Sequence, residues 1–130
     1  MRYIIGLSVL FALMLHGQLI AESRWPAFRG ADGLGQSADE DVPVTWNTSD
    51  VAWRMELAGM GHSSPCLWDD RIFLTGAQKN GGQVERYVIC LNRADGKILW
   101  RRLASTGPAE KLHTMNSFAT ATCASDGERV

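Results

Sequence analysis

The chain has 130 residues, which is near the size of one small domain. The chain has thirteen basic and fourteen acidic residues. Without Arg2, which belongs to the N-terminal segment described next, the counts are twelve basic and fourteen acidic residues. A slightly acidic chain offers no positive field to a phosphate backbone. Nucleic acid is therefore excluded as the expected partner.

The first 21 residues have the pattern of a secretory signal peptide. Arg2 supplies a positive charge, residues 4–15 form an uncharged run, and Ala21 is a small residue suited to cleavage. The competing interpretation is a transmembrane helix, which needs about 20 apolar residues, whereas His16 ends this run. We therefore expect residues 1–21 to be a signal peptide, the protein to be exported to the periplasm or the extracellular space, and no stable membrane span.

The chain contains three cysteines, at positions 66, 90 and 123. An odd number at wide spacing is not a disulfide framework. One of the three possible pairs could form in an oxidising compartment. The interpretation that we favour is that of buried free thiols on strands.

Residues 22–50 are expected to form an extended N-terminal strap. Trp25 and Phe28 supply aromatic groups, and a glycine-rich run follows at residues 30–35. Glycine-rich phosphate loops follow a strand and open a helix, and neither element is predicted here. Residues 47–49 form a glycosylation sequon, which matters only in a host that glycosylates exported chains.

From residue 51 onward the pattern is typical of β-strands, and no stretch has the apolar periodicity of a helix. Residues 52–57 alternate between polar and apolar side chains, which predicts a half-buried strand. Asp95-Gly96 is a hairpin signal, because glycine adopts positive φ freely. The other predicted strands are residues 64–68, 71–75, 87–91 and 98–100, with residues 76–85 as a polar connection.

The strands recur in a way that indicates an array of similar β units. Residues 64–102 hold four short strands, which is the size of one propeller blade. Trp53 recurs as Trp100, 47 residues later, and residues 64–72 align with residues 122–130 at an offset of 58. The unequal offsets indicate one type of unit with insertions of variable length.

Residues 90–100, C-L-N-R-A-D-G-K-I-L-W, resemble the tryptophan-docking motif of PQQ-like β-propeller repeats, A-x-D-x-x-T-G-x-x-x-W. Gly96 and Trp100 match the motif at the required spacing. Three positions carry conservative departures where the family prefers Ala, Asp and Thr, namely Cys90, Asn92 and Asp95. Residues 25–30, 61–65 and 126–130 are also similar to a planctomycete-type group of exported propellers with such repeats.

The resemblance covers residues 51–130 and implies an all-β fold, a β-propeller of four-stranded blades. Trp53 and Trp100 would then be docking groups that fill the gap between adjacent blades. Residues 51–130 would make only about one and a half blades. Because such units bury their faces on neighbouring units, we expect this chain to be the N-terminal part of a longer protein.

The histidines outside the N-terminal segment suggest one candidate surface site. His62 and His113 lie in loop-like segments that could converge at one propeller rim, together with Asn116. Their spacing is not a known metal-ligand pattern, so ordinary loop histidines are favoured and no metal is predicted. Ser63 and Ser64 lack the G-x-S-x-G elbow of a hydrolase, so no catalytic residue is predicted.

Two functions follow from the resemblance. The favoured one is an exported, non-catalytic propeller, a binding or scaffold module that takes a protein, peptide or glycan at one rim. The alternative is the N-terminal part of a PQQ-dependent alcohol or sugar dehydrogenase. The vicinal Cys-Cys pair of those enzymes is missing from this sequence. We therefore expect no cofactor here, with PQQ binding possible only through residues beyond Val130, and we favour a protein that is not an enzyme.

Overall fold

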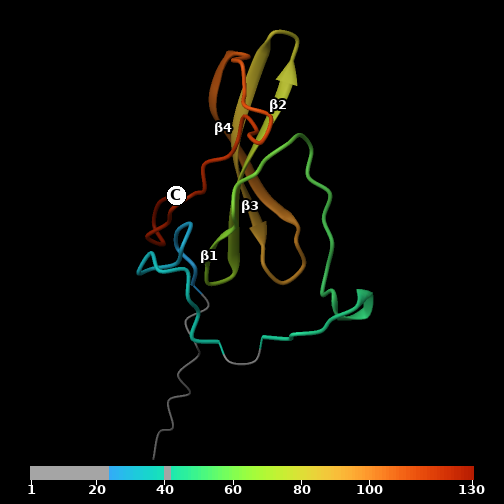
Figure 1. Ribbon diagram of the computed structural model, residues 1–130, viewed down its shortest axis with the longest axis vertical. Helices are drawn as coiled ribbons and strands as arrows, with labels where there is room; N and C mark the ends of the chain where they lie inside the picture. The colour runs from blue at the N-terminus through green and yellow to red at the C-terminus, as the bar shows by residue number, and fades with distance from the viewer. Residues whose placement is uncertain (1–23, 40–41) are drawn as a thin grey trace, which may run out of the picture.

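The computed structural model describes residues 24–39 and 42–130, so the expected signal peptide lies outside the described residues. Its centre is a four-stranded antiparallel sheet in which each strand pairs with its neighbours in sequence (Figure 1). The strands are Cys66–Trp68 (β1), Arg71–Asn80 (β2), Gln83–Asn92 (β3) and Ile98–Pro108 (β4). The described residues contain one helical turn, the 3-10 helix η1 (Thr48–Asp50). The prediction of an all-β chain is confirmed.

Asn47 sets the start of η1. Its side-chain oxygen accepts from the backbone N–H of Ser49 at 2.9 Å, and its own backbone N–H donates to the Asp50 carboxylate at 2.8 Å. This reciprocal arrangement is a capping box, which satisfies N–H groups that a short helix leaves without partners. The asparagine of the predicted sequon is thus the residue that begins the helix.

The β2–β3 hairpin is longer than the sequence predicts. The prediction of a polar connection over residues 76–85 is wrong, because β2 and β3 pair along their whole length and Gly81 and Gly82 alone join them. Ala77 and Val84 are 1% and 0% exposed, so this part of the hairpin has an apolar face beneath its polar residues. That buried face keeps the two strands paired as far as the turn.

The predicted strand at residues 52–57 is also wrong. This segment forms no strand, and only Trp53 and Leu57 in it are partly buried. An alternating pattern becomes a strand only where another strand offers its backbone groups. No strand of the described residues pairs with this segment, so it runs as an extended loop.

Two irregular segments add to the edge of the sheet. Trp25 of the strap pairs with Leu67 of β1 through two backbone hydrogen bonds of 2.9 Å. Met60 pairs in the same way with Ala77 of β2, at 2.9 and 2.8 Å. Figure 1 shows residues 24–39 of the strap beside the β1 end of the sheet, near the C-terminal end of the chain, whereas η1 lies away from β1.

The core lies mainly on one face of the sheet. The registers place Cys66, Phe73, Cys90 and Trp100 directly opposite one another across the four strands. The segment after β4 supplies the residues that cover this face. One buried cluster consists of Cys66, Phe73, Cys90 and Cys123, and a second of Ala77, Val84 and Ala119. In this structure all three cysteines are buried, reduced thiols; Cys66 and Cys90 lie on strands, and Cys123 lies in the segment after β4.

β4 is bulged at two places. The pairing with β3 shifts between Arg86 and Tyr87 and again between Cys90 and Leu91. These shifts leave Ala104 and Leu99 of β4 as extra residues without a direct partner on β3.

No helix of the described residues is long and apolar enough to cross a membrane.

Candidate functional site

The most specific contact of the motif residues joins Trp53 to the loop between β3 and β4. The indole Nε1 of Trp53 donates to the carbonyl oxygen of Arg93 at 2.8 Å. The indole ring lies on Gly96, where a Cβ atom would come within 2.3 Å of a ring carbon. Gly96 also has a φ of 71°, in the left-handed region. Only glycine both lacks a Cβ atom that would collide with the indole and adopts this positive φ without strain. Glycine at this position therefore allows Trp53 to lie on the loop.

Two polar side chains hold this loop in shape. The Asn92 side-chain oxygen accepts from the backbone N–H of Ala94 at 2.8 Å. The Asp95 carboxylate accepts from the backbone N–H of Lys97 at 3.1 Å and from its Nζ at 2.8 Å. The hydrogen bond from the Lys97 side chain lowers the pKa of Asp95, and the same bond raises the pKa of Lys97. Asn92 and Asp95 therefore pre-form the surface on which Trp53 lies.

Trp100, the tryptophan of the motif itself, has a different environment. It lies opposite Cys90 on β3 and is partly buried. Its ring centroid is 5.9 Å from that of Phe73, with the two planes tilted by 43°. Trp100 thus packs on the core face of its own sheet, where aromatic pairs contribute beyond the area that they bury.

A second tryptophan–glycine contact involves the C-terminal segment. A Cβ atom on Gly127 would lie 2.6 Å from the ring of Trp68, and Gly127 has a φ of 92°. The Arg24 guanidinium lies 4.5 Å from the centroid of the same ring and pairs with Asp69 at 2.8 Å. Trp68 therefore links the strap, β1 and the C-terminal segment.

The predicted rim residues lie in or beside one loop. The backbone N–H of Asn116 donates to the carbonyl oxygen of His113 at 2.9 Å, so these two residues share one turn. His113 Nδ1 accepts from the backbone N–H of Met115 at 3.3 Å. The backbone N–H of His62 donates to the carbonyl oxygen of Ala119 at 2.9 Å, which places it against the end of the same loop. All three predicted side chains are exposed.

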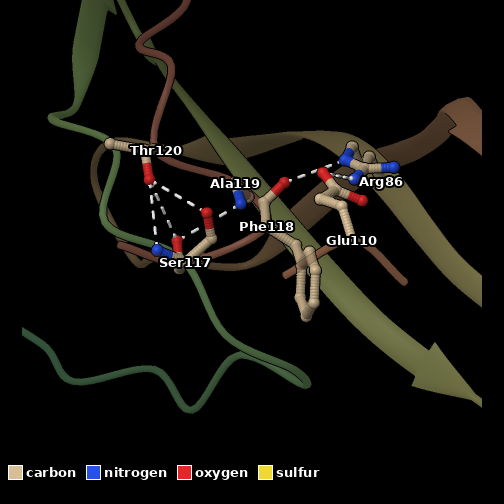
Figure 2. Close-up of polar contacts among 6 residues, drawn as sticks. All are labelled: Arg86, Glu110, Ser117, Phe118, Ala119 and Thr120. Carbon is tan, nitrogen blue, oxygen red and sulfur yellow. Dashed lines mark hydrogen bonds and ion pairs between the residues drawn. The ribbon is translucent and has the colours of Figure 1, made fainter. Parts of the chain in front are cut away.

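A polar network that the sequence does not predict anchors this loop to β3. Figure 2 shows Arg86 donating to the carbonyl oxygen of Phe118, at 3.0 Å, and pairing with Glu110 at 2.5 Å. This hydrogen bond from Arg86 lowers the pKa of Glu110. The Ser117 backbone N–H donates to the hydroxyl oxygen of Thr120 at 3.2 Å (Figure 2). The partners of Arg86 are 24 and 32 residues away, so no local pattern reveals them.

Two cavities have linings that do not include the predicted rim residues. One of about 530 Å³ lies beside β2 and Phe118. The other, of about 630 Å³, lies between the strap and β1. Its lining residues include Arg24, Trp25, Asp32, Asp39, Leu67 and Arg93. Its lining combines apolar side chains with side chains of both charges.

Among residues 24–39 and 42–130, no group of three or more His, Cys, Asp or Glu side chains is arranged to hold a metal ion. Comparisons with protein-family models, with curated proteins and with solved structures gave no match to this chain.

Proposed function

We propose that the sheet is one blade of an exported, non-catalytic β-propeller of PQQ-like repeats, which acts as a binding or scaffold module. The contact of Trp53 with the Gly96 loop is the observation that carries this proposal. Trp53 precedes the sheet and stands at the repeat position of Trp100. A large planar side chain from one unit that fills a glycine slot on the next would join successive blades.

The proposed ligand is a protein, peptide or glycan, and the proposed contact surface is the loop region that holds His62, His113 and Asn116. The three side chains are exposed and can donate and accept hydrogen bonds. The loop of His113 and Asn116 is attached to β3 through Arg86, and the backbone of His62 is hydrogen-bonded to the end of that loop. Binding residues are commonly found on loops that a rigid sheet positions in this way.

The test is a binding screen of the full chain against arrayed glycans and peptides. We expect the variant carrying His62→Ala, His113→Ala and Asn116→Ala to lose at least about tenfold in affinity for any ligand found, since several hydrogen bonds are removed together. Arg102→Ala, an exposed change on β4, is the matched control and should bind as the wild type does.

Unchanged binding by the triple variant would show that the ligand contacts another surface. Equilibrium dialysis with PQQ and calcium tests the alternative function, the N-terminal part of a PQQ-dependent dehydrogenase. Stoichiometric PQQ binding that is lost on substitution of individual residues within 22–130 would favour a dehydrogenase instead.

Export gives a separate prediction. Expressed in a bacterial host with its own leader, the protein should be recovered from the periplasm or the medium with Glu22 as its first residue. The pattern of Arg2, the apolar run and Ala21 is the reason. Mass spectrometry of the intact protein and of its N-terminal peptide measures this. Cytosolic protein that retains Met1 would contradict export.

A further inference from the structure

We propose that Cys66 and Cys123 form a disulfide that cross-links β1 to the C-terminal segment, while Cys90 stays a free thiol. This inference goes beyond the binding function. Only the compartment in which the bond forms in the cell rests on the export proposed above.

Hydrogen bonds place the two cysteines on neighbouring stretches of chain. The backbone N–H of Ser64 donates to the hydroxyl oxygen of Thr122 at 3.0 Å. Cys66 follows two residues after Ser64, and Cys123 follows directly after Thr122. Both cysteines belong to the same buried cluster, with Cys66 0% and Cys123 9% exposed.

A second junction joins Cys66 itself to the backbone just after Cys123. The carbonyl oxygen of Pro26 accepts from the Cys66 thiol at 3.2 Å and from the backbone N–H of Ser125 at 2.9 Å. The Cys66 sulfur and the backbone two residues after Cys123 therefore meet at one oxygen atom. The Ser64–Thr122 contact precedes both cysteines, and the Pro26 contact joins Cys66 to the residue two positions after Cys123, so the two stretches of chain are held side by side at the cysteines.

The sheet register excludes a bond between Cys66 and Cys90. Phe73 lies directly between them, opposite Cys66 on one side and opposite Cys90 on the other. Two strand spacings separate the Cα atoms of such residues by about 9–10 Å. A disulfide requires Cα atoms no more than about 7 Å apart. Cys123, which belongs to no strand, is free of this constraint.

The bond forms by exchange with a small disulfide, such as oxidised glutathione. One cysteine thiolate attacks the small disulfide, which gives a mixed disulfide and releases one small thiol. The second thiolate then attacks the protein sulfur of the mixed disulfide and releases the other small thiol. Two electrons pass to the small disulfide, and the two protons lost by the cysteines are taken up by the released thiols.

The environment of the two thiols determines how fast the disulfide forms. Burial raises the pKa of Cys66 to about 11 and also raises the pKa of Cys123. A folded, reduced chain therefore holds little of the reactive thiolate at neutral pH. We expect rapid cross-linking while the chain folds and slow cross-linking once it has folded reduced.

The experiment folds the full chain from denaturant in a buffer of reduced and oxidised glutathione, then blocks free thiols with iodoacetamide in denaturant. We expect one label per chain, on Cys90, and a proteolytic peptide that joins Cys66 to Cys123. The oxidised form should unfold with an equilibrium constant about 30- to 1000-fold lower than the reduced form, as for a typical disulfide. Urea titration with and without dithiothreitol measures this.

Alanine variants assign the bond independently of stability. Cys90→Ala should keep both the cross-linked peptide and the stabilisation, whereas Cys66→Ala and Cys123→Ala should lose both. Three labelled cysteines in the wild type would overturn the proposal, as would a cross-link that contains Cys90. The number of labelled cysteines is measured on denatured wild-type chains, so a variant that fails to fold does not change that result. The result also does not depend on whether the protein is exported, because the chain is folded in vitro.

Discussion

Gly96→Ala should lower the free energy of unfolding by about 2–5 kcal/mol. The new methyl group would lie within 2.3–2.8 Å of three Trp53 ring atoms. The left-handed backbone at this position adds about 1–2 kcal/mol of strain for alanine, and overpacking adds about 1–3 kcal/mol. Urea titration followed by circular dichroism measures the change. Indole fluorescence should also change as Trp53 moves off the loop.

Gly81→Ala is the matched control for this substitution. Gly81 has a φ of 61° but no atom within 4 Å of an added Cβ, so alanine there incurs strain without a collision. The difference between the two variants isolates the contact with Trp53. A loss at Gly96 no larger than the loss at Gly81 would show that Trp53 does not lie on this loop in solution.

Trp100→Ala should lower the free energy of unfolding by about 3 kcal/mol, the lower end of the range for a large core aromatic. The indole packs against Phe73 and the cluster of buried cysteines, and its removal leaves a cavity on that face. The residue is partly rather than fully buried, which sets the loss at the lower end. Chemical denaturation of the two proteins gives the difference.

Trp46→Ala serves as its control, because this tryptophan is 71% exposed and should change stability by less than about 0.5 kcal/mol. Equal effects of the two substitutions would mean that Trp100 contributes no more than a surface residue. The inference that Trp100 packs on the core face of its own sheet would then be wrong.

The sequence predicts the positions of the strands better than their lengths. The runs at 71–75 and 87–91 fall inside β2 and β3, but the pairing continues to Gly81 and Gly82. The residues near this turn are mostly polar, and only Ala77 and Val84 reveal that one side of them is buried. Two glycines between two strands were the available signal for a tight hairpin.

Contacts between distant residues are the part that the sequence could not give. The motif identifies Gly96 as a special position, but spacing alone does not show that Trp53 lies on it while Trp100 packs against Phe73. The same holds for Arg86, which anchors the loop after β4 through residues far away in sequence. Such contacts depend on the registers of the sheet, and the local periodicity of the sequence does not predict the registers.

The two bulges of β4 have a consequence for self-association. An edge strand with free backbone groups is a template on which further chains can add and grow into fibrils. The extra residues at Leu99 and Ala104 interrupt the regular hydrogen-bond spacing along this edge. Arg101 and Arg102, both exposed, would face like charges in a second copy paired antiparallel through this region. Irregular backbone and positive charge thus make this edge a poor seed for amyloid growth.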